Sequence, residues 1–373
     1  MNDTAPFSPW PESLLALARP EIRSLAPYRH APWDPAYERL HANENPWRNP
    51  ADTSIAGLNR YPEPHPLALE SRLAELYGVP PQCLIAGRGS DEAIDLLVRV
   101  FCAAGHDAIL QCPPTFGMYS VAAGVQGAAV VDVPLLRDAG YSLDLPGIIA
   151  AARNTSGSRV KLVFLCAPNN PTGNDVPLAH VEFLLRELEG QAIVVVDEAY
   201  VEFSGRESLA ARLGEFPHLV VLRTLSKAYG LAGVRCGVAI SHPDLVGLLR
   251  RAIPPYAIPE PCIEAILAAL GPAGMTMADH TQRQLLAMRA AMLTALAAAP
   301  TVTKVWPSAT NFIMLDSTDP AVIMVKAREV RLLLRDFSSG TRTPGAVRIS
   351  LGTPEQNMRL LRALGAPLPE GFV

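Results

Sequence analysis

Short runs of apolar residues alternate with amphipathic stretches along most of the chain. Between residues 83 and 240 the runs are continuous and about four to six residues long, which is typical of strands buried on both faces of a parallel sheet. The stretch Glu92–Phe101 places Ile94, Leu97, Val98 and Phe101 on one face of a helix. The predicted strands are Cys83–Ala86, Ala108–Gln111, Ala128–Val133, Lys161–Cys166, Ile193–Val196, Leu219–Leu222 and Cys236–Ile240.

Helices separate several of these strands, and the order of the elements indicates the fold class. Buried strands that alternate with helices are typical of a mostly parallel mixed sheet sandwiched by helices. The proline-rich stretch from Pro254 to Pro261 interrupts the alternation. We therefore predict an α/β fold with a smaller α+β domain after the interruption. The other segments behind this prediction are the helices Leu67–Tyr77, Val181–Glu189 and about Met275–Ala298, and the strands Asn311–Leu315 and Ala346–Leu351.

The chain is predicted to divide into three parts. Residues 1–60 carry many prolines and several aromatic residues. We interpret them as a short helix, Pro11–Arg19, and an extended arm that lies on other structure, as part of the small domain or of a dimer contact. The large α/β domain is predicted over residues 61–255, and the small C-terminal α+β domain over residues 256–373.

Composition and charge exclude several classes of protein. The chain is 49% apolar and 18% charged with a formal net charge of −4, which rules out disorder as the main state. No stretch reaches about 18 uninterrupted apolar residues, so we expect no membrane span, and the acidic, proline-containing start does not have the pattern of a secretory signal. Because the chain has no basic run, nucleic acid is not expected as a partner.

The spacing of cysteines and histidines argues against a metal site. The six cysteines stand in apolar runs without a CxxC pair, and the eight histidines show neither HxxxH nor HExxH spacing. We therefore predict no metal ion. Scattered, reduced thiols fit a cytoplasmic protein better than a disulfide framework.

Polar residues that could carry chemistry follow the predicted strands. In an open parallel sheet, ligands bind at the carboxyl ends of the strands. The turn Gly87–Asp91, which includes Gly89 and Ser90, follows one strand and opens a helix, where backbone N–H groups and the helix dipole favour an anion. The same turn is also consistent with an ordinary helix cap, and it lacks the third glycine of a dinucleotide-binding fingerprint.

Two further strand ends carry a carboxylate and an amine. Asp197 follows a buried strand, where a charge is costly unless a cation or a donor faces it, although a helix cap is an alternative. Lys227 is one of only four lysines, and its apolar and hydroxyl neighbours would leave its amine reactive, although a solvated surface lysine is also consistent with the pattern. Thr224, Ser226 and Arg235 together suit a phosphate group.

The combination of strand ends is more specific than its parts. In chain order they supply an anion-binding turn, an asparagine turn at Asn169–Gly173, a carboxylate with Tyr200 three residues on, and a lysine with an arginine eight residues on. Pyridoxal phosphate needs this set, because an amine must bind its aldehyde, an anion must keep its ring nitrogen protonated, and donors must hold its phenolate and phosphate. We therefore predict pyridoxal 5′-phosphate as the cofactor.

On these residues the chain resembles the histidinol-phosphate aminotransferases, a branch of the pyridoxal-phosphate aminotransferases with the aspartate-aminotransferase-like fold, or fold type I. The similarity runs from about Tyr28 to the last helix, and its narrower markers are the early Pro-Tyr, the Ala-Asn-Glu-Asn-Pro run and the Pro-Thr-Phe-Gly-Met-Tyr run. The matching segments are His41–Pro46, Asn59–Pro62, Gly87–Glu92, Cys112–Tyr119, Asn169–Gly173, Asp197–Phe203, Arg223–Gly237 and Arg348–Thr353.

The resemblance implies a role for each matching residue at the cofactor. Lys227 would bind the aldehyde and move the substrate's proton, and Asp197 would pair with the ring nitrogen. Tyr200 and Asn170 would hydrogen-bond the phenolic oxygen, and Phe116 would stack on the ring, where the family often has tyrosine. The phosphate would be held by Gly89, Ser90, Asp91, Thr224, Ser226 and Arg235, together with Tyr61 reaching in from a neighbouring subunit.

For the substrates, the resemblance implies Arg348 as the anchor of an anionic group, with Arg335, Tyr28 and Asn45 in support. The fork of a guanidinium matches two oxygens of a carboxylate or a phosphate. A surface ion pair for Arg335 and a packing role for Tyr28 are the alternatives. The segment between Tyr28 and His41 is proline-rich and unlike the family's usual arm, which bears on the substrate preference.

The implied reaction exchanges an amino group between L-histidinol phosphate and 2-oxoglutarate in histidine biosynthesis, carried out by a cytoplasmic homodimer. An aromatic amino acid aminotransferase and a threonine-phosphate decarboxylase of the same fold are alternatives. A regulator with an aminotransferase-like domain is disfavoured, because about 60 residues before the cofactor motifs are too few and too acidic for a DNA-binding module. A nicotinamide-dependent oxidoreductase is disfavoured by the missing glycine fingerprint.

Overall fold

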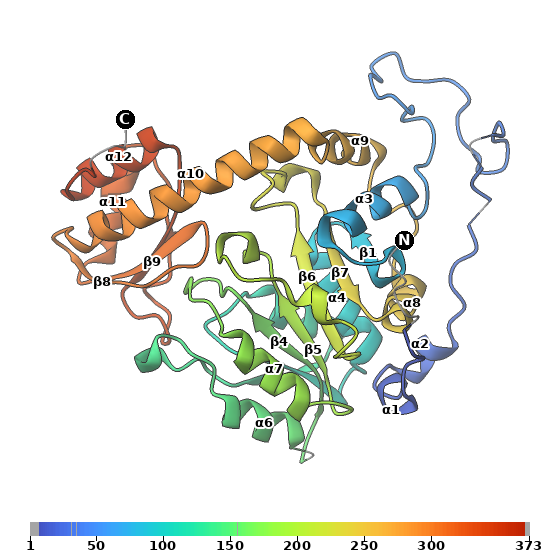
Figure 1. Ribbon diagram of the computed structural model, residues 1–373, viewed down its shortest axis with the longest axis horizontal. Helices are drawn as coiled ribbons and strands as arrows, with labels where there is room; N and C mark the ends of the chain where they lie inside the picture. The colour runs from blue at the N-terminus through green and yellow to red at the C-terminus, as the bar shows by residue number, and fades with distance from the viewer. Residues whose placement is uncertain (1–6, 31, 35, 155, 370–373) are drawn as a thin grey trace.

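The computed structural model describes residues 7–30, 32–34, 36–154 and 156–369. In this described part, the predicted fold is confirmed: a mostly parallel mixed sheet is covered by helices, and a smaller α+β unit lies beside it (Figure 1). β7 runs antiparallel to both of its neighbours, whereas the other adjacent strands are parallel. The order across the sheet is β1 (Leu84–Gly87), β7 (Gly237–Ser241), β6 (Leu219–Thr224), β5 (Ile193–Asp197), β4 (Arg159–Cys166), β2 (Asp107–Gln111) and β3 (Ala129–Asp132).

Helices cover both faces of this sheet. Successive residues of a strand point to opposite faces, so every residue of a central strand is buried on one side or the other. In β5, Ile193 and Val195 pack into one core and Val194 and Val196 into the other, and all four are fully buried. Two-sided burial explains the continuous apolar runs of the sequence. One core contains side chains of α3 (Leu67–Tyr77), α6 (Leu145–Arg153), α7 (Leu178–Glu187) and α9 (Glu260–Ala269), and the other contains side chains of α4 (Ser90–Phe101), α5 (Met118–Gln126) and α8 (Pro243–Ala252).

The smaller unit is an antiparallel four-stranded sheet packed against helices. Its core joins Met292 and Leu296 of the long helix α10 to Ile313 and Leu315 of β9. The same helix reaches from the larger unit to the smaller one (Figure 1). The sheet order is β10 (Arg335–Asp336), β11 (Ala346–Ser350), β9 (Phe312–Ser317) and β8 (Val302–Val305), and the helices are α10 (Pro272–Ala297), α11 (Pro320–Glu329) and α12 (Pro354–Leu364).

The described residues contain no single helix that is long and apolar enough to cross a membrane, and α9 and α10 have the necessary length and composition only as a pair bent by 72°. In the same residues, no group of three or more His, Cys, Asp or Glu side chains is arranged to hold a metal ion.

The N-terminal segment differs from the single helix expected over Pro11–Arg19. The chain forms two short helices, α1 (Glu12–Leu15) and α2 (Pro20–Ser24). Pro20 disfavours a helical conformation of the residue before it, so Arg19 is extended and a new helix begins at the proline. Leu14 and Leu17 are buried in the core that contains α4 and α8, so this segment packs on the larger unit.

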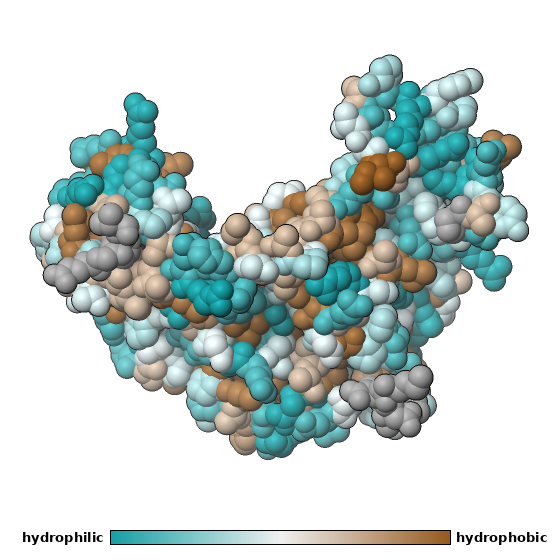
Figure 2. Space-filling model, turned by 45° about the horizontal axis from the view of Figure 1, so that its top comes forward, coloured by the Kyte–Doolittle hydropathy of each residue, from teal (hydrophilic) through white to brown (hydrophobic). Residues whose placement is uncertain are grey.

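The described residues from 25 to 66 form an arm that contains neither helix nor strand. The arm extends away from the body of the molecule (Figure 1), and in the space-filling view the arm and the smaller unit rise on either side of a hollow (Figure 2). Its apolar side chains are largely exposed, with Leu40 at 95%, Ile55 at 86% and Trp47 at 78%. In the single chain much of the arm is therefore exposed, although it contacts the larger unit where the Ala56 N–H donates to Oε1 of Glu264 and where Tyr61 stacks on Tyr256.

The predicted division at residue 255 stays a prediction. α9 lies beyond that point, yet its residues Ile263 and Ile266 pack into a core of the larger unit. The smaller unit's own core begins with Met292 of α10. α10 is thus the segment that connects the two cores.

Candidate active site

A cavity opens at the edge of the large sheet where β1, β4, β5 and β6 end. β4, β5 and β6 are parallel, and β1 runs in the same direction because both β1 and β6 are antiparallel to β7. The turns that follow these strands therefore meet at one edge, where ligands bind in open α/β sheets. The cavity has a volume of about 270 Å³ and is lined by Gly89, Ser90, Asp91, Phe116, Cys166, Asn170, Asp197, Ala199, Tyr200, Thr224, Ser226, Lys227, Ala232, Arg235 and Arg348.

Asp197 is the last residue of β5, and it is only 3% exposed. Two donors hold its carboxylate: the Tyr119 hydroxyl donates to Oδ2 over 2.8 Å, and the Ala199 N–H donates to Oδ1 over 3.1 Å. Burial raises the pKa of Asp197 to about 6, and these two hydrogen bonds act in the opposite direction. At neutral pH the carboxylate is therefore mostly ionised but poorly hydrated, so it favours a cationic partner in the cavity.

Lys227 follows β6 and lines the same cavity. Its amine nitrogen lies 5.6 Å from the centre of the Tyr200 ring. Loss of hydration lowers the pKa of Lys227, and the positive charge of Arg348 lowers it further. A lower pKa increases the fraction of neutral amine, which is the form that attacks a carbonyl carbon.

The start of α4 provides an anion site. Gly89, Ser90 and Asp91 line the cavity where this helix begins, so the free N–H groups of its first turn and its dipole favour negative charge. Nη2 of Arg235 lies 3.3 Å from Oδ2 of Asp91. Gly89 has φ of 81°, a backbone conformation that favours glycine over residues with a side chain.

Two hydroxyl groups complete the donors near this turn. Thr224 ends β6 and Ser226 follows it, and both line the cavity. The Thr224 hydroxyl lies within hydrogen-bond distance of the Ser226 hydroxyl, at 3.1 Å, and of the Cys236 carbonyl oxygen, at 3.2 Å. Backbone N–H groups, hydroxyls and one guanidinium therefore converge on a single region, which is the donor set of a phosphate site.

Arg348 enters the cavity from β11, in the smaller unit. Its Nη1 donates to Oδ1 of Asn170, and its Nε is buried without a hydrogen-bond partner among the described residues. Burial lowers the pKa of Arg348, and the charge of Arg335 acts in the same direction. A partly unsatisfied guanidinium in a cavity is suited to bind an anionic group.

Four residues predicted for the site do not line the cavity. Tyr28, Asn45 and Tyr61 are exposed residues of the arm, and Tyr61 stacks on Tyr256 with 4.8 Å between the ring centres. Arg335 is exposed on β10, directly opposite Arg348 in the strand register. The roles predicted for these four residues stay predictions.

Sequence reasoning missed Tyr119, which donates to the carboxylate of Asp197. A signal was available, because Tyr119 stands three residues after Phe116 at the start of a helix, and such a spacing brings two side chains together. The two rings meet edge to face, with centres 5.7 Å apart and planes at 83°.

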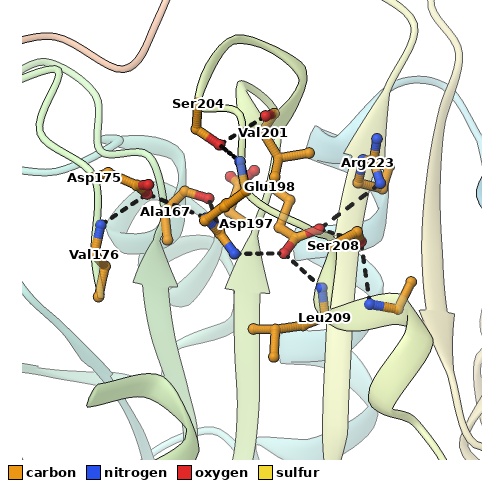
Figure 3. Close-up of polar contacts among 12 residues, drawn as sticks. Ala167, Asp175, Val176, Asp197, Glu198, Val201, Ser204, Ser208, Leu209 and Arg223 are labelled. Carbon is orange, nitrogen blue, oxygen red and sulfur yellow. Dashed lines mark hydrogen bonds and ion pairs between the residues drawn. The ribbon is translucent and has the colours of Figure 1, made fainter. Parts of the chain in front are cut away.

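Sequence reasoning also missed a buried network directly behind Asp197. Figure 3 shows Glu198 reaching from the end of β5 toward Ser208, Leu209 and Arg223. Glu198 is fully buried, and Nη1 of Arg206 lies 3.2 Å from its Oε1. The same Arg206 donates through Nη2 to the Ala167 carbonyl oxygen, over 2.6 Å. The network therefore ties the end of β5 to the segment that carries Asn170.

The residues of the cavity fit pyridoxal phosphate. The cofactor requires a reactive amine, an anion for its ring nitrogen, donors for its phenolic oxygen and a phosphate cradle. The cavity offers Lys227, the buried Asp197, Tyr200 with Asn170, and the convergent donors at the start of α4. Arg348 adds a site for a second anion beside them.

The chain belongs to the aminotransferase class I and II family, whose sequence pattern matches residues 41–364. It is a pyridoxal-phosphate-dependent transaminase, and the cofactor predicted from the sequence is confirmed. Within the family, the chain is similar to histidinol-phosphate aminotransferases. It is 44% identical to the one of Stenotrophomonas maltophilia, over 95% of this chain and 97% of the relative, and 44% identical to one of Xylella fastidiosa, over 94% and 96%. The resemblance stated from the sequence is therefore confirmed.

The chain is also similar to solved structures, at lower sequence identity. The histidinol-phosphate aminotransferase of Sinorhizobium meliloti in complex with pyridoxal-5′-phosphate matches with a TM-score of 0.73 and 25% identity, over 82% of each chain. The L-threonine-O-3-phosphate decarboxylase of Porphyromonas gingivalis matches with a TM-score of 0.68 and 25% identity, over 83% of this chain and 90% of that one.

Proposed function

We propose that this protein is a histidinol-phosphate aminotransferase of histidine biosynthesis. It converts L-histidinol phosphate and 2-oxoglutarate into 3-(imidazol-4-yl)-2-oxopropyl phosphate and L-glutamate. The observation that carries the proposal is the 44% identity to the Stenotrophomonas maltophilia enzyme over nearly the whole of both chains. The cavity supports it, because a transaminase that accepts two anionic substrates needs a cation besides those of its cofactor site, and Arg348 provides one.

We assign the cofactor contacts to the residues that line the cavity. When bound, pyridoxal phosphate supplies an electron sink for the negative charge that develops at the substrate's α-carbon. Asp197 holds the ring nitrogen, Tyr200 and Asn170 hold the phenolic oxygen, and Phe116 packs on the ring face. Gly89, Ser90, Asp91, Thr224, Ser226 and Arg235 form the phosphate cradle.

Lys227 has two tasks in this proposal. In the absence of substrate it would hold the cofactor covalently, and once the substrate's amine has displaced it, its free neutral amine would take the proton from the substrate's α-carbon. Both tasks require an unprotonated amine, which the lowered pKa of Lys227 favours at neutral pH. Asp197 supports the same step because, as an anion, it holds a proton on the ring nitrogen of the cofactor.

Arg348 is the proposed anchor for the anionic group of either substrate, with Arg335 beside it. The two residues face each other across β10 and β11, so two guanidinium groups lie at the same edge of the smaller unit. Tyr28 and Asn45 of the arm are proposed to contact the substrate as well.

We further propose a cytoplasmic homodimer in which the arm of each subunit completes the site of the other. Tyr61 does not line the cavity of its own chain, and the arm that carries it is largely exposed. Burial of the arm's apolar side chains against a second copy would remove them from water. In this arrangement Tyr61 contacts the cofactor phosphate of the partner.

A comparison of three substrates tests the proposed reaction. We expect kcat/KM for histidinol phosphate to exceed that for phenylalanine by roughly 100-fold or more, because a site built for a polar group rejects an analogue that lacks it. Threonine phosphate is the third substrate, and release of carbon dioxide from it is measured beside amino transfer. Faster turnover of phenylalanine, or decarboxylation of threonine phosphate, would replace the proposal by the corresponding alternative.

A further inference from the structure

Tyr119 is a fully buried residue of α5 that does not line the cavity. Its ring is stacked on Phe164 of β4, with centres 4.7 Å apart and planes at 13°, and it meets Phe116 edge to face. Its hydroxyl donates to Oδ2 of Asp197 over 2.8 Å. Packing between two rings leaves the phenol little freedom, so its hydroxyl is fixed relative to the carboxylate.

We propose that Tyr119 is a positioning residue that acts on the cofactor through Asp197 and Phe116. Its hydroxyl fixes one oxygen of the carboxylate, and its ring supports the aromatic wall, so both groups are presented to the cavity together. The inference rests on the proposed function only in that Asp197 and Phe116 are taken as cofactor contacts. The inference adds Tyr119, which lies behind the cavity, as a residue on which the cofactor contacts of Asp197 and Phe116 both depend.

A phenol suits this position because it donates one hydrogen bond to a buried charge and is otherwise apolar. A buried carboxylate oxygen that loses its donor carries an uncompensated desolvation cost. The hydrogen bond from Tyr119 accordingly lowers the pKa of Asp197, against the larger effect of burial. Among the described residues, the other titratable groups that interact with this carboxylate are Asp91 of α4, Cys166 of β4, Tyr200 after β5 and Lys227 after β6.

The variant Tyr119→Phe removes the hydroxyl and keeps the ring. We expect it to weaken the binding of pyridoxal phosphate to the cofactor-free protein by about tenfold or more at neutral pH, as expected when a charged group loses a hydrogen bond. The midpoint of the pH dependence of binding should move to higher pH, because Asp197 is then protonated more easily. Fluorescence titration from pH 5 to pH 9 measures both quantities.

Tyr77→Phe is the matched control. Tyr77 is also a buried tyrosine of the larger unit, but its hydroxyl has no hydrogen-bond partner among the described residues. Its removal should therefore change cofactor affinity by less than about twofold. If Tyr119→Phe behaves like this control, with unchanged affinity and an unchanged pH midpoint, the proposal is wrong.

A double-mutant cycle separates positioning through Asp197 from a general packing effect. In an Asp197→Asn background, Tyr119→Phe should lose most of its effect on cofactor affinity, whereas a purely structural role predicts the same factor in both backgrounds. The titration uses pyridoxal phosphate and no substrate. A failure of the proposed function would be seen instead as absent turnover of histidinol phosphate by a wild-type protein that binds its cofactor normally.

Discussion

At the scale of single residues, one physical cause prepares both reactive groups of the cavity. Loss of hydration disfavours charge, so it raises the pKa of an acid and lowers that of a base. The pKa of Asp197 is raised to about 6 and the pKa of Lys227 is lowered, so both pKa values move toward neutral pH. Near neutral pH the protein therefore holds a poorly hydrated carboxylate and an amine that gives up its proton more easily than an exposed lysine.

The first prediction concerns the cost of the buried charge on Asp197. The folded pKa of about 6 lies above the ordinary value of 3.8, so folding favours the protonated acid, and stability is lost as the pH rises through 6. Asp197→Asn cannot ionise. We compare the free energy of unfolding of the variant with that of the wild type, both without cofactor. The difference in favour of the variant should grow by roughly 1–2 kcal/mol as the pH rises from 5 to 8. Urea unfolding at both pH values measures this gain, and parallel behaviour of the two proteins would contradict it.

At the scale of elements, the site depends on the close approach of β7 to the turn that opens α4. Gly237 begins β7, and it is paired in register with Gly87 of β1 and Thr224 of β6. A Cβ at this position would overlap the backbone nitrogen of Ser90 and lie 2.5 Å from the carbonyl carbon of Gly89. The absence of a side chain on β7 thus allows the anion-binding turn to adopt its position.

The second prediction tests this approach. We expect Gly237→Ala to lower the free energy of unfolding by about 1–3 kcal/mol and to weaken pyridoxal phosphate binding, because the turn must shift to admit the methyl group. Gly247→Ala in α8 is the control, since nothing lies within 4 Å of a Cβ there, and it should stabilise the protein by about 0.5–1 kcal/mol. Urea unfolding and cofactor titration compare the two variants, and equal behaviour would refute the role of Gly237.

At the scale of the whole molecule, the larger unit supplies most of the cavity and the smaller unit supplies Arg348. The arm carries three further predicted site residues, yet in the single chain they lie outside the cavity lining. Residues of the arm are held to each other, because the Glu44 carboxylate accepts hydrogen bonds from Arg60 and from the Tyr61 N–H. An arm with internal order and exposed apolar side chains is well suited to contact a second copy.

The third prediction tests whether the arm completes the partner's site. Lys227→Ala removes the amine from one cavity, and Tyr61→Ala removes the proposed arm contact. If the sites are shared, a hybrid dimer contains one intact site, so equal mixing after subunit exchange should restore about a quarter of wild-type activity. The assay is run at a cofactor concentration that does not saturate the Tyr61 variant.

Mixing Lys227→Ala with Asp197→Ala is the control for this hybrid experiment. Both residues line the cavity of the same chain, so no hybrid of these two variants contains an intact site. No activity in the Tyr61 mixture would show that the arm does not complete the partner's site, whereas activity in the control would show that mixing by itself restores activity.

The amino-acid sequence by itself determined the buried strands and the chemistry at their ends. Both are local properties: a continuous apolar run specifies a strand covered on two faces, and the residues after it stand at the carboxyl end of that strand. For this reason the positions of Asp197 and Lys227 after strands followed from spacing alone. The resemblance of the motifs to one family added the reaction class and the roles of single residues at the cofactor.

Only the tertiary structure decided what those residues meet. The bond from Tyr119 to Asp197 spans 78 positions, and that from Arg348 to Asn170 spans 178. The antiparallel direction of β7 and the exposure of the arm likewise depend on contacts that no local pattern encodes. The pKa of Asp197 also depends on long-range contacts, because burial and the donor Tyr119 from a distant segment help to set it. Local spacing fixes which groups stand at the sheet edge, and long-range packing fixes their hydration, their partners and therefore their reactivity.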